Sequence, residues 1–205
     1  MGKYVEIAKV QLEYNIWKHL CISLFLLAVS PLFLGVSNLD PEQSARVLEI
    51  YVALIGIILF VPVFLPEQNR DLWDVVKARY TSMFSVYLTR LVISFVITAV
   101  LIGIYMAVMR AGNCGMETGK YYFGTLAEAA AFGGLGVFAC SVSDNLIAGY
   151  MIPLVYYAAA LGAGTKYLGM FYPFGMLTDY RTKYWLLAAG IILMMSGIIF
   201  FRRKR

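Results

Sequence analysis

The chain has 205 residues, of which 61% are hydrophobic and 14% are charged, and its formal net charge is +5. This composition excludes an intrinsically disordered chain and is typical of an integral membrane protein. The positive charge does not indicate nucleic-acid binding, because the basic residues lie in short loops and tails, where they set the orientation of membrane spans. We therefore expect membrane lipid, and no nucleic acid, among the partners.

Six apolar runs predict six transmembrane helices. A helix needs about 20 apolar residues to cross a bilayer, and these runs do not alternate as the strands of a membrane barrel do. We predict an all-α membrane protein with a single transmembrane domain over residues 1–205. Its spans are expected at about residues 20–39, 48–66, 87–109, 121–142, 145–163 and 184–201.

The segment before the first span, residues 3–18, predicts an interfacial helix. Ile7, Val10, Tyr14 and Trp17 form an apolar stripe at helical spacing, and such helices lie along the membrane surface. A plain cytosolic helix is the alternative.

The orientation follows from the basic tail at residues 202–205, which directly follows the last span. Basic residues beside a span favour the cytosol, and six spans then place both termini there. The polar loop at residues 67–82 is expected on the same side. Residues 40–47, 111–119 and 166–182 are expected to face outward.

The cytosolic loop predicts a short helix that ends at about Tyr80. Leu72, Val75 and Val76 share one face of this helix, and Trp73 lies on a neighbouring face. An exposed Trp needs a surface that buries it. Either the lipid interface or a soluble partner protein could provide that surface.

The outer segment, residues 164–183, is unusually apolar for a loop. Glycine and proline interrupt it, yet Tyr167, Met170, Phe171 and Tyr172 are typical of a buried or interfacial segment. We predict a short re-entrant segment that dips into the outer leaflet, with its backbone satisfied by neighbouring protein. The alternative is an aromatic belt that lies on the lipid headgroups.

Small residues and one charge distinguish the fourth span. Ala127, Ala130, Ala131 and Gly134 allow close helix packing, so this span is expected at the centre of the bundle. Glu128 is the only ionisable residue well inside a span, which makes it a candidate proton site or a contact for a cationic substrate. The structural alternative, which we favour, is a carboxyl group bonded to Ser, Tyr or backbone of a neighbouring helix.

The sequence contains no nucleotide-binding loop, no metalloprotease or hydrolase motif and no carboxylate pair within the membrane. We therefore expect neither an enzyme nor a cofactor or metal site in this chain. A conduit, with its energy source in another subunit, is the more natural interpretation.

The layout resembles the permease subunit of a type-2 ATP-binding-cassette exporter. That family has a cytosolic interfacial helix and six spans, and its longest cytosolic loop follows the second span. The corresponding loop here is FLPEQNRDLWDVVKARY at residues 64–80, and the third span opens with YLTRL at residues 87–91. The small-residue fourth span and its turn correspond to GGLGVFACSVSDN at residues 133–145.

The resemblance implies a protein of the bacterial plasma (inner) membrane with two kinds of partner. A second permease subunit, identical or not, completes the pathway. Separate cytosolic ATPase subunits, which hold ATP and Mg, dock on the coupling helix in the loop. The docking residues would be Arg70, Asp71, Leu72, Trp73, Asp74 and Val76.

The resemblance also implies that the second and fifth spans line the translocation path. An aromatic, uncharged wall suits an amphipathic or apolar cargo, such as a drug, a peptide or a lipid-like molecule. Aromatic packing between spans is the alternative for the same side chains. The candidate path residues are Phe60, Phe64, Tyr150, Tyr156 and Tyr157.

Two other functions stay open at this point. One is a small membrane-embedded enzyme or scaffold that uses Glu128. The other is a secondary transporter driven by protons through Glu128, although the internal repeat typical of such transporters is not found between residues 20–109 and 121–201.

Overall fold

The computed structural model describes residues 15–68 and 83–204, and the regular secondary structure in these ranges is entirely helical. The predicted coupling residues 70–76 lie outside the described residues, as does most of the predicted interfacial helix. Trp17 is described, and with it the first helix of the bundle begins, three residues before the predicted span.

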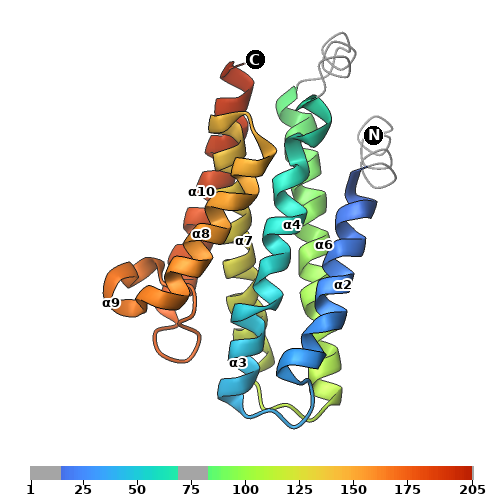
Figure 1. Ribbon diagram of the computed structural model, residues 1–205, viewed down its shortest axis with the longest axis vertical. Helices are drawn as coiled ribbons and strands as arrows, with labels where there is room; N and C mark the ends of the chain where they lie inside the picture. Colours follow the sequence, from blue (N-terminus) through green and yellow to red (C-terminus); the bar gives the residue numbers. More distant parts are fainter. Residues whose placement is uncertain (1–14, 69–82, 205) are drawn as a thin grey trace.

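Six helical segments run alternately up and down (Figure 1). The two described ranges, 15–68 and 83–204, both begin and end at one end of the bundle, the terminal end. The connections at residues 35–40, 112–117 and 164–180 lie at the other, the loop end. The segments are α2 (Trp17–Leu34), a broken second segment of α3 (Pro41–Ile50), η2 (Val52–Leu54), α4 (Ile55–Phe60) and η3 (Val61–Gln68), then α6 (Met83–Ala111), α7 (Thr118–Ser143), α8 (Leu146–Ala163) and α10 (Arg181–Lys204).

Four of these segments are long and apolar enough to cross a membrane. They are Pro41–Pro66, Met83–Ala111, Thr118–Ser143 and Arg181–Lys204, and shorter apolar helices occupy Trp17–Leu32 and Leu146–Gly162. The all-helical prediction is therefore confirmed for the described residues.

Local sequence signals fix the connections at the loop end. Asp40 and Gln43 form a capping box at the start of α3, and Pro41 takes the first helical position, where its missing N–H is harmless. Two backbone hydrogen bonds join the connection at residues 35–40 to the connection at residues 112–117. The N–H of Asn38 donates to the carbonyl of Gly112 at 2.7 Å, and that of Gly115 donates to Leu39 at 2.9 Å.

The fourth span, α7, lies at the centre of the bundle, as its small residues predict. It packs against α10, α8, α4 and α6, and Ala127 and Ala130 are fully buried. Its most extensive contact is with α10. A Cβ atom on Gly190 would lie 2.6 Å from the carbonyl oxygen of Ala130, so only glycine permits these backbones to approach this closely.

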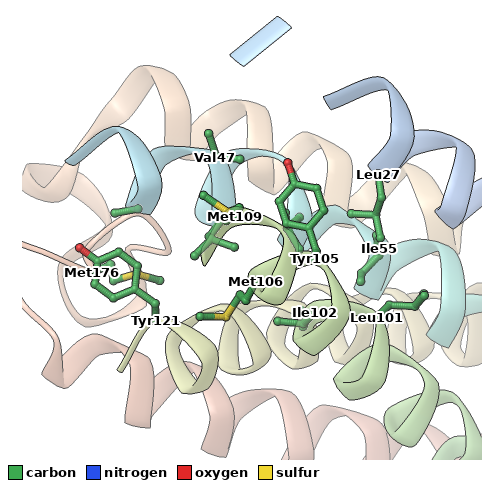
Figure 2. Close-up of a cluster of buried hydrophobic side chains, with 14 of the residues drawn as sticks. Leu27, Val47, Ile55, Leu101, Ile102, Tyr105, Met106, Met109, Tyr121 and Met176 are labelled. Atoms are coloured by element: carbon green, nitrogen blue, oxygen red, sulfur yellow. The ribbon is translucent and has the colours of Figure 1, made fainter. Parts of the chain in front are cut away.

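Three apolar clusters fill the described part of the bundle, and one of them surrounds Phe132. Near the loop end, side chains from α2, α3, α4, α6 and α7 converge around Met106 and Met109, and Met176 of the outer segment joins them (Figure 2). Near the terminal end the cluster is aromatic. Phe64 stacks on Phe201 with 4.2 Å between ring centroids, and both rings meet Tyr87 edge-on.

Between α8 and α10 the chain forms the outer segment, which includes α9 (Thr165–Leu168) and η4 (Gly169–Phe171). Figure 1 shows α9 projecting sideways from the bundle. Tyr167 and Met170 are exposed there, whereas Pro173, Gly175 and Met176 are buried. One half of the segment thus presents aromatic side chains outward, and the other half packs into the bundle.

Candidate functional site

The most unusual feature of the interior is a buried cluster of three ionisable side chains: Glu49, Glu128 and Lys183. The ammonium group of Lys183 donates to Oε1 of Glu49 at 2.6 Å and to Oε1 of Glu128. Its third hydrogen bond goes to the backbone carbonyl of Pro173 at 2.5 Å. A lysine ammonium has three donors, so this one is fully satisfied without water.

Burial of the cluster is nearly complete. Glu128 and Lys183 are 0% exposed and Glu49 is 5% exposed. Ionisable groups are found in such surroundings only when they are paired or hydrogen-bonded, because water no longer solvates them. The cluster is therefore a candidate functional site rather than an ordinary surface ion pair.

Three elements from distant parts of the sequence position the cluster. Glu49 lies near the end of α3, Glu128 lies in the first half of α7, and Lys183 lies in the first turn of α10. Gly124, one turn before Glu128, makes room for the side chain of Met176 beside the lysine. A Cβ atom there would lie 3.6 Å from Cε of Lys183 and 2.9 Å from Cε of Met176.

The cluster also holds the outer segment against the bundle. The backbone N–H of Met176 donates to Oε1 of Glu49 at 2.6 Å, while the carbonyl of Pro173 accepts from Lys183. The segment then turns back into α10 through backbone hydrogen bonds from Asp179 to Gly175 at 3.0 Å and from Thr182 to Asp179 at 3.2 Å. Hence the outer segment is tied to α3 directly and to α7 through Lys183.

The charges in the cluster do not balance. Two carboxylates face one ammonium group, so the fully ionised cluster would carry one net negative charge. Moreover, Oε2 of Glu128 is buried and has no hydrogen-bond partner among the described residues. A carboxylate oxygen without a donor is costly in an interior of low polarity.

A pocket of about 330 Å³ adjoins the cluster at the loop end. Tyr172, Gly175 and Thr182 line it, and each directly precedes a residue that contacts or belongs to the cluster. Burial raises the pKa of the Tyr172 hydroxyl, and the negative charge of Glu49 raises it further. The pocket is completed by Gly169, Met170, Thr178 and Asp179.

The predicted path residues fall into two groups. Phe60 and Phe64 are fully buried inside the protomer, where Phe60 lies 6.2 Å from Phe95 between ring centroids. Tyr150, Tyr156 and Tyr157 lie half-buried on α8. The structure does not bring the two aromatic groups together on one open surface. Phe60 and Phe64 instead pack against other rings in the interior of the chain.

The half-buried tyrosines of α8 connect this helix to the loop end. The hydroxyl of Tyr157 donates to the carbonyl of Ile50 at 2.8 Å, and that of Tyr156 donates to the carbonyl of Phe171. The ring of Phe132 in α7 packs against both tyrosines with 5.9 Å between centroids. Their assignment to a translocation path stays a prediction.

The sequence identified Glu128 but not its partners. Lys183 was expected in the outer segment, and Glu49 was not singled out. The expectation that the spans hold no carboxylate pair is wrong, because Glu49 and Glu128 meet at the ammonium group of Lys183. One signal could have revealed both: the second, fourth and sixth spans all start at the loop end, and each carries one of these charges near that start. Opposite charges at a similar depth on spans of the same direction are candidates for pairing.

No family model, curated protein or solved structure matches this chain. No group of three His, Cys, Asp or Glu side chains suited to a metal ion occurs in the part of the chain that the structure describes. The long apolar helices give the chain the architecture of a multi-pass helical membrane protein. Its most distinctive site is the Glu49–Glu128–Lys183 cluster.

Proposed function

We propose that this chain is the membrane-spanning permease subunit of a type-2 ATP-binding-cassette exporter. In this proposal a separate cytosolic ATPase supplies the energy, and the cargo is amphipathic or apolar. One observation carries the proposal. The connection between the second and third segments joins the end of η3 to the start of α6. Both of these helix ends lie at the terminal end, together with the start of α2 and the end of α10 (Figure 1).

This arrangement is the one that an ATPase-driven permease requires. A soluble ATPase must reach its coupling segment from the cytosol, and the terminal end carries the basic residues Arg202, Arg203 and Lys204 beside the last helix. Basic residues next to a span favour the cytosolic side. The longest polar connection, residues 69–82, would then face the ATPase.

The outer segment and α7 support the same proposal. The family that the sequence resembles has short outer helices between the fifth and sixth spans, and α9 and η4 occupy that position here. It also has a fourth span rich in small residues, and α7 packs centrally through such residues. Both features concern architecture and say nothing of the cargo.

A second permease subunit would cover exposed apolar side chains, which occur on two separate helices, α2 and α8 (Figure 1). Phe25 and Leu32 on α2 are 71% and 82% exposed, and Ile147 and Val155 on α8 are 67% and 66% exposed. In a membrane such side chains meet either lipid or another helix. We propose that the subunit interface includes α8, so that Tyr150, Tyr156 and Tyr157 lie nearer the pathway than Phe60 and Phe64.

The decisive experiment asks whether a cytosolic ATPase depends on this chain. The tagged protein is purified from its native membrane in mild detergent, and ATP hydrolysis is measured with and without the predicted docking anchors. Truncating an anchor of this kind commonly costs about 2 kcal/mol or more, which corresponds to roughly thirty-fold weaker docking. The double variant Trp73→Ala, Val76→Ala should therefore insert normally but lose the ATPase and transport together.

The matched control is Trp185→Ala, because Trp185 is also an exposed tryptophan but lies at the loop end of α10. The Trp185→Ala variant should retain both the bound ATPase and its ATP hydrolysis. A preparation with no associated ATPase, or a double variant with undiminished hydrolysis and transport, would contradict the proposal.

A further inference from the structure

We propose that the Glu49–Glu128–Lys183 cluster is a proton-binding site that holds one proton at neutral pH, bound at Oε2 of Glu128. This proposal is independent of the exporter proposal, since it concerns the resting protonation of one protomer and needs neither an ATPase nor a cargo.

The first argument is the count of charges. Around Lys183, α3 contributes Glu49 and α7 contributes Glu128, and Lys183 is the only cation that the described residues bring to these carboxylates. The remaining titratable groups near the cluster are the carboxyl group of Asp179, which lines the adjoining pocket and adds no positive charge, and tyrosine hydroxyls, which are neutral at neutral pH. The hydroxyls belong to Tyr121 on α7, Tyr156 and Tyr157 on α8, and Tyr172 in the outer segment.

The fully ionised cluster therefore has one negative charge that nothing compensates. Glu128 and Lys183 are completely excluded from solvent, so water cannot screen this charge. In such surroundings a carboxylate takes up a proton instead of remaining ionised without a partner. One proton makes the cluster electrically neutral, because one carboxylate then matches one ammonium group.

The second argument locates the proton. Oε1 of Glu49 accepts two hydrogen bonds, from Lys183 and Met176. Oε1 of Glu128 accepts from Lys183, whereas Oε2 of Glu128 is buried and accepts none from the described residues. An ionised carboxylate can only accept hydrogen bonds, so an oxygen without donors is the favourable position for a proton.

The bound proton has a structural role at the loop end. The neutral cluster holds Pro173 and Met176 of the outer segment against α3 and α10. Without the proton, the same contacts would enclose an uncompensated charge. The proton therefore stabilises the outer segment in its packed position.

Infrared spectroscopy tests the proposal directly, because a protonated carboxyl group absorbs at a frequency distinct from that of a carboxylate. The full-length protein is reconstituted in lipid nanodiscs at neutral pH, and spectra of variants are subtracted from the wild-type spectrum. Glu128→Gln should remove one protonated-carboxyl band. Glu49→Gln should remove it as well, because Glu128 can then ionise against Lys183 alone.

Replacing the cation should have the opposite effect. In Lys183→Met both carboxyl groups lose their partner, so the protonated-carboxyl band should approximately double. The control is Glu117→Gln, which removes a carboxylate that pairs with Lys120 at the surface and should leave the band unchanged. Each variant is compared only after its helical circular dichroism matches that of the wild type.

Two results would overturn the proposal. One is a Glu128→Gln spectrum that loses a carboxylate band rather than a protonated-carboxyl band, which would mean that the cluster is fully ionised. The other is a protonated-carboxyl band of full strength in Glu49→Gln. That result would mean that the band does not arise from the excess of two carboxylates over one ammonium group in this cluster. The two glutamine variants keep the size of the side chains, so the test stands even if Lys183→Met does not fold.

Discussion

Lys183 in the first turn of α10 places its ammonium group on the carboxylate of Glu128 in α7, although the two residues are separated by 55 positions in the sequence. Both side chains are 0% exposed. Further along the same pair of helices, Gly190 packs against the backbone of Ala130. The helices are thus joined by an ionic contact near the loop end and by close backbone packing beyond it.

The ion cluster should contribute strongly to stability. Lys183→Met leaves two buried carboxyl groups without their shared partner, and removal of one partner from a buried pair typically costs about 3–5 kcal/mol. Unfolding would be followed by circular dichroism as the fraction of denaturing detergent is increased. Lys120→Met is the control, because Lys120 and Glu117 form an exposed pair and such pairs contribute about 1 kcal/mol or less. Equal losses for both variants would contradict the prediction.

The close packing of α7 and α10 should not tolerate a methyl group. Gly190→Ala would place a Cβ atom 2.6 Å from the carbonyl of Ala130, and overpacking of this kind costs about 1–3 kcal/mol. Gly103→Ala in α6 is the matched control, since its Cβ atom would lie 3.7 Å from the ring of Tyr122. Alanine favours a helix over glycine, so this control should leave the free energy of unfolding unchanged or slightly higher. A stable Gly190→Ala variant would argue against the described helix contact.

The buried aromatic cluster should behave as a core rather than as the wall of a path. Phe64→Ala removes a ring that stacks on Phe201, and the loss of a buried Phe costs about 3–5 kcal/mol. Phe200→Ala, next to Phe201 but 44% exposed, should cost much less. If Phe64→Ala unfolds like the wild type but alters transport of an amphipathic dye, Phe64 belongs to the path after all.

Cysteine labelling should reveal the sidedness of the bundle. In a variant without Cys21, Cys114 and Cys140, a cysteine introduced at Glu117 should react with an impermeant reagent added from outside intact cells, because residue 117 lies at the loop end. A cysteine at Arg203, at the terminal end, should react only after the cells are opened. A cysteine at Asp74 is expected to behave like the one at Arg203. The reverse labelling pattern would show that the protein has the opposite orientation in the membrane.

Glu128 should be dispensable for transport itself. Glu128→Gln retains an oxygen that accepts the hydrogen bond from Lys183, so transport should remain within a few-fold of the wild type. The measurement is cargo efflux by the complete complex in vesicles, with protein assembly checked in parallel. Complete loss of transport in a well-assembled glutamine variant would favour proton-coupled transport instead.

Much of the fold could be predicted from the apolar runs. A long apolar segment has no water to hydrogen-bond its backbone, and a helix pairs each N–H and C=O group within the segment itself. Leu91–Met109 lies wholly within α6, and the Asn145 expected at the start of the fifth span caps α8, where its side chain accepts from the N–H of Ile147 at 2.9 Å. The small residues around Ala130 likewise indicated that α7 would be central. These are local properties, since propensity, length and side-chain size act within one segment.

The site was accessible to sequence reasoning only in part. Glu128 attracts attention because a charge within an apolar run is expensive, and its favoured interpretation was a hydrogen-bonded structural carboxyl. Its partner is instead a lysine from a segment that was expected to face outward. Lys183 lies among polar and aromatic residues at the start of its helix, where nothing in the local pattern distinguishes a solvated lysine from a buried one.

By itself, then, the sequence determined where most of the helices lie, because backbone satisfaction and helix caps depend on neighbours along the chain. The prediction of a connection at residues 40–47 is wrong, since α3 already begins at Pro41 and buries Ala45 and Val47 against the bundle. Only the tertiary structure decided that Glu49, Glu128 and Lys183 meet and that Phe64 packs inside the protomer. Such contacts depend on the rotation and depth of each helix relative to the others. Gly190 allows the close approach of α10 to α7, and Gly124 leaves room for Met176, but these partners lie far away in the chain. The local pattern therefore does not specify which residues are brought together.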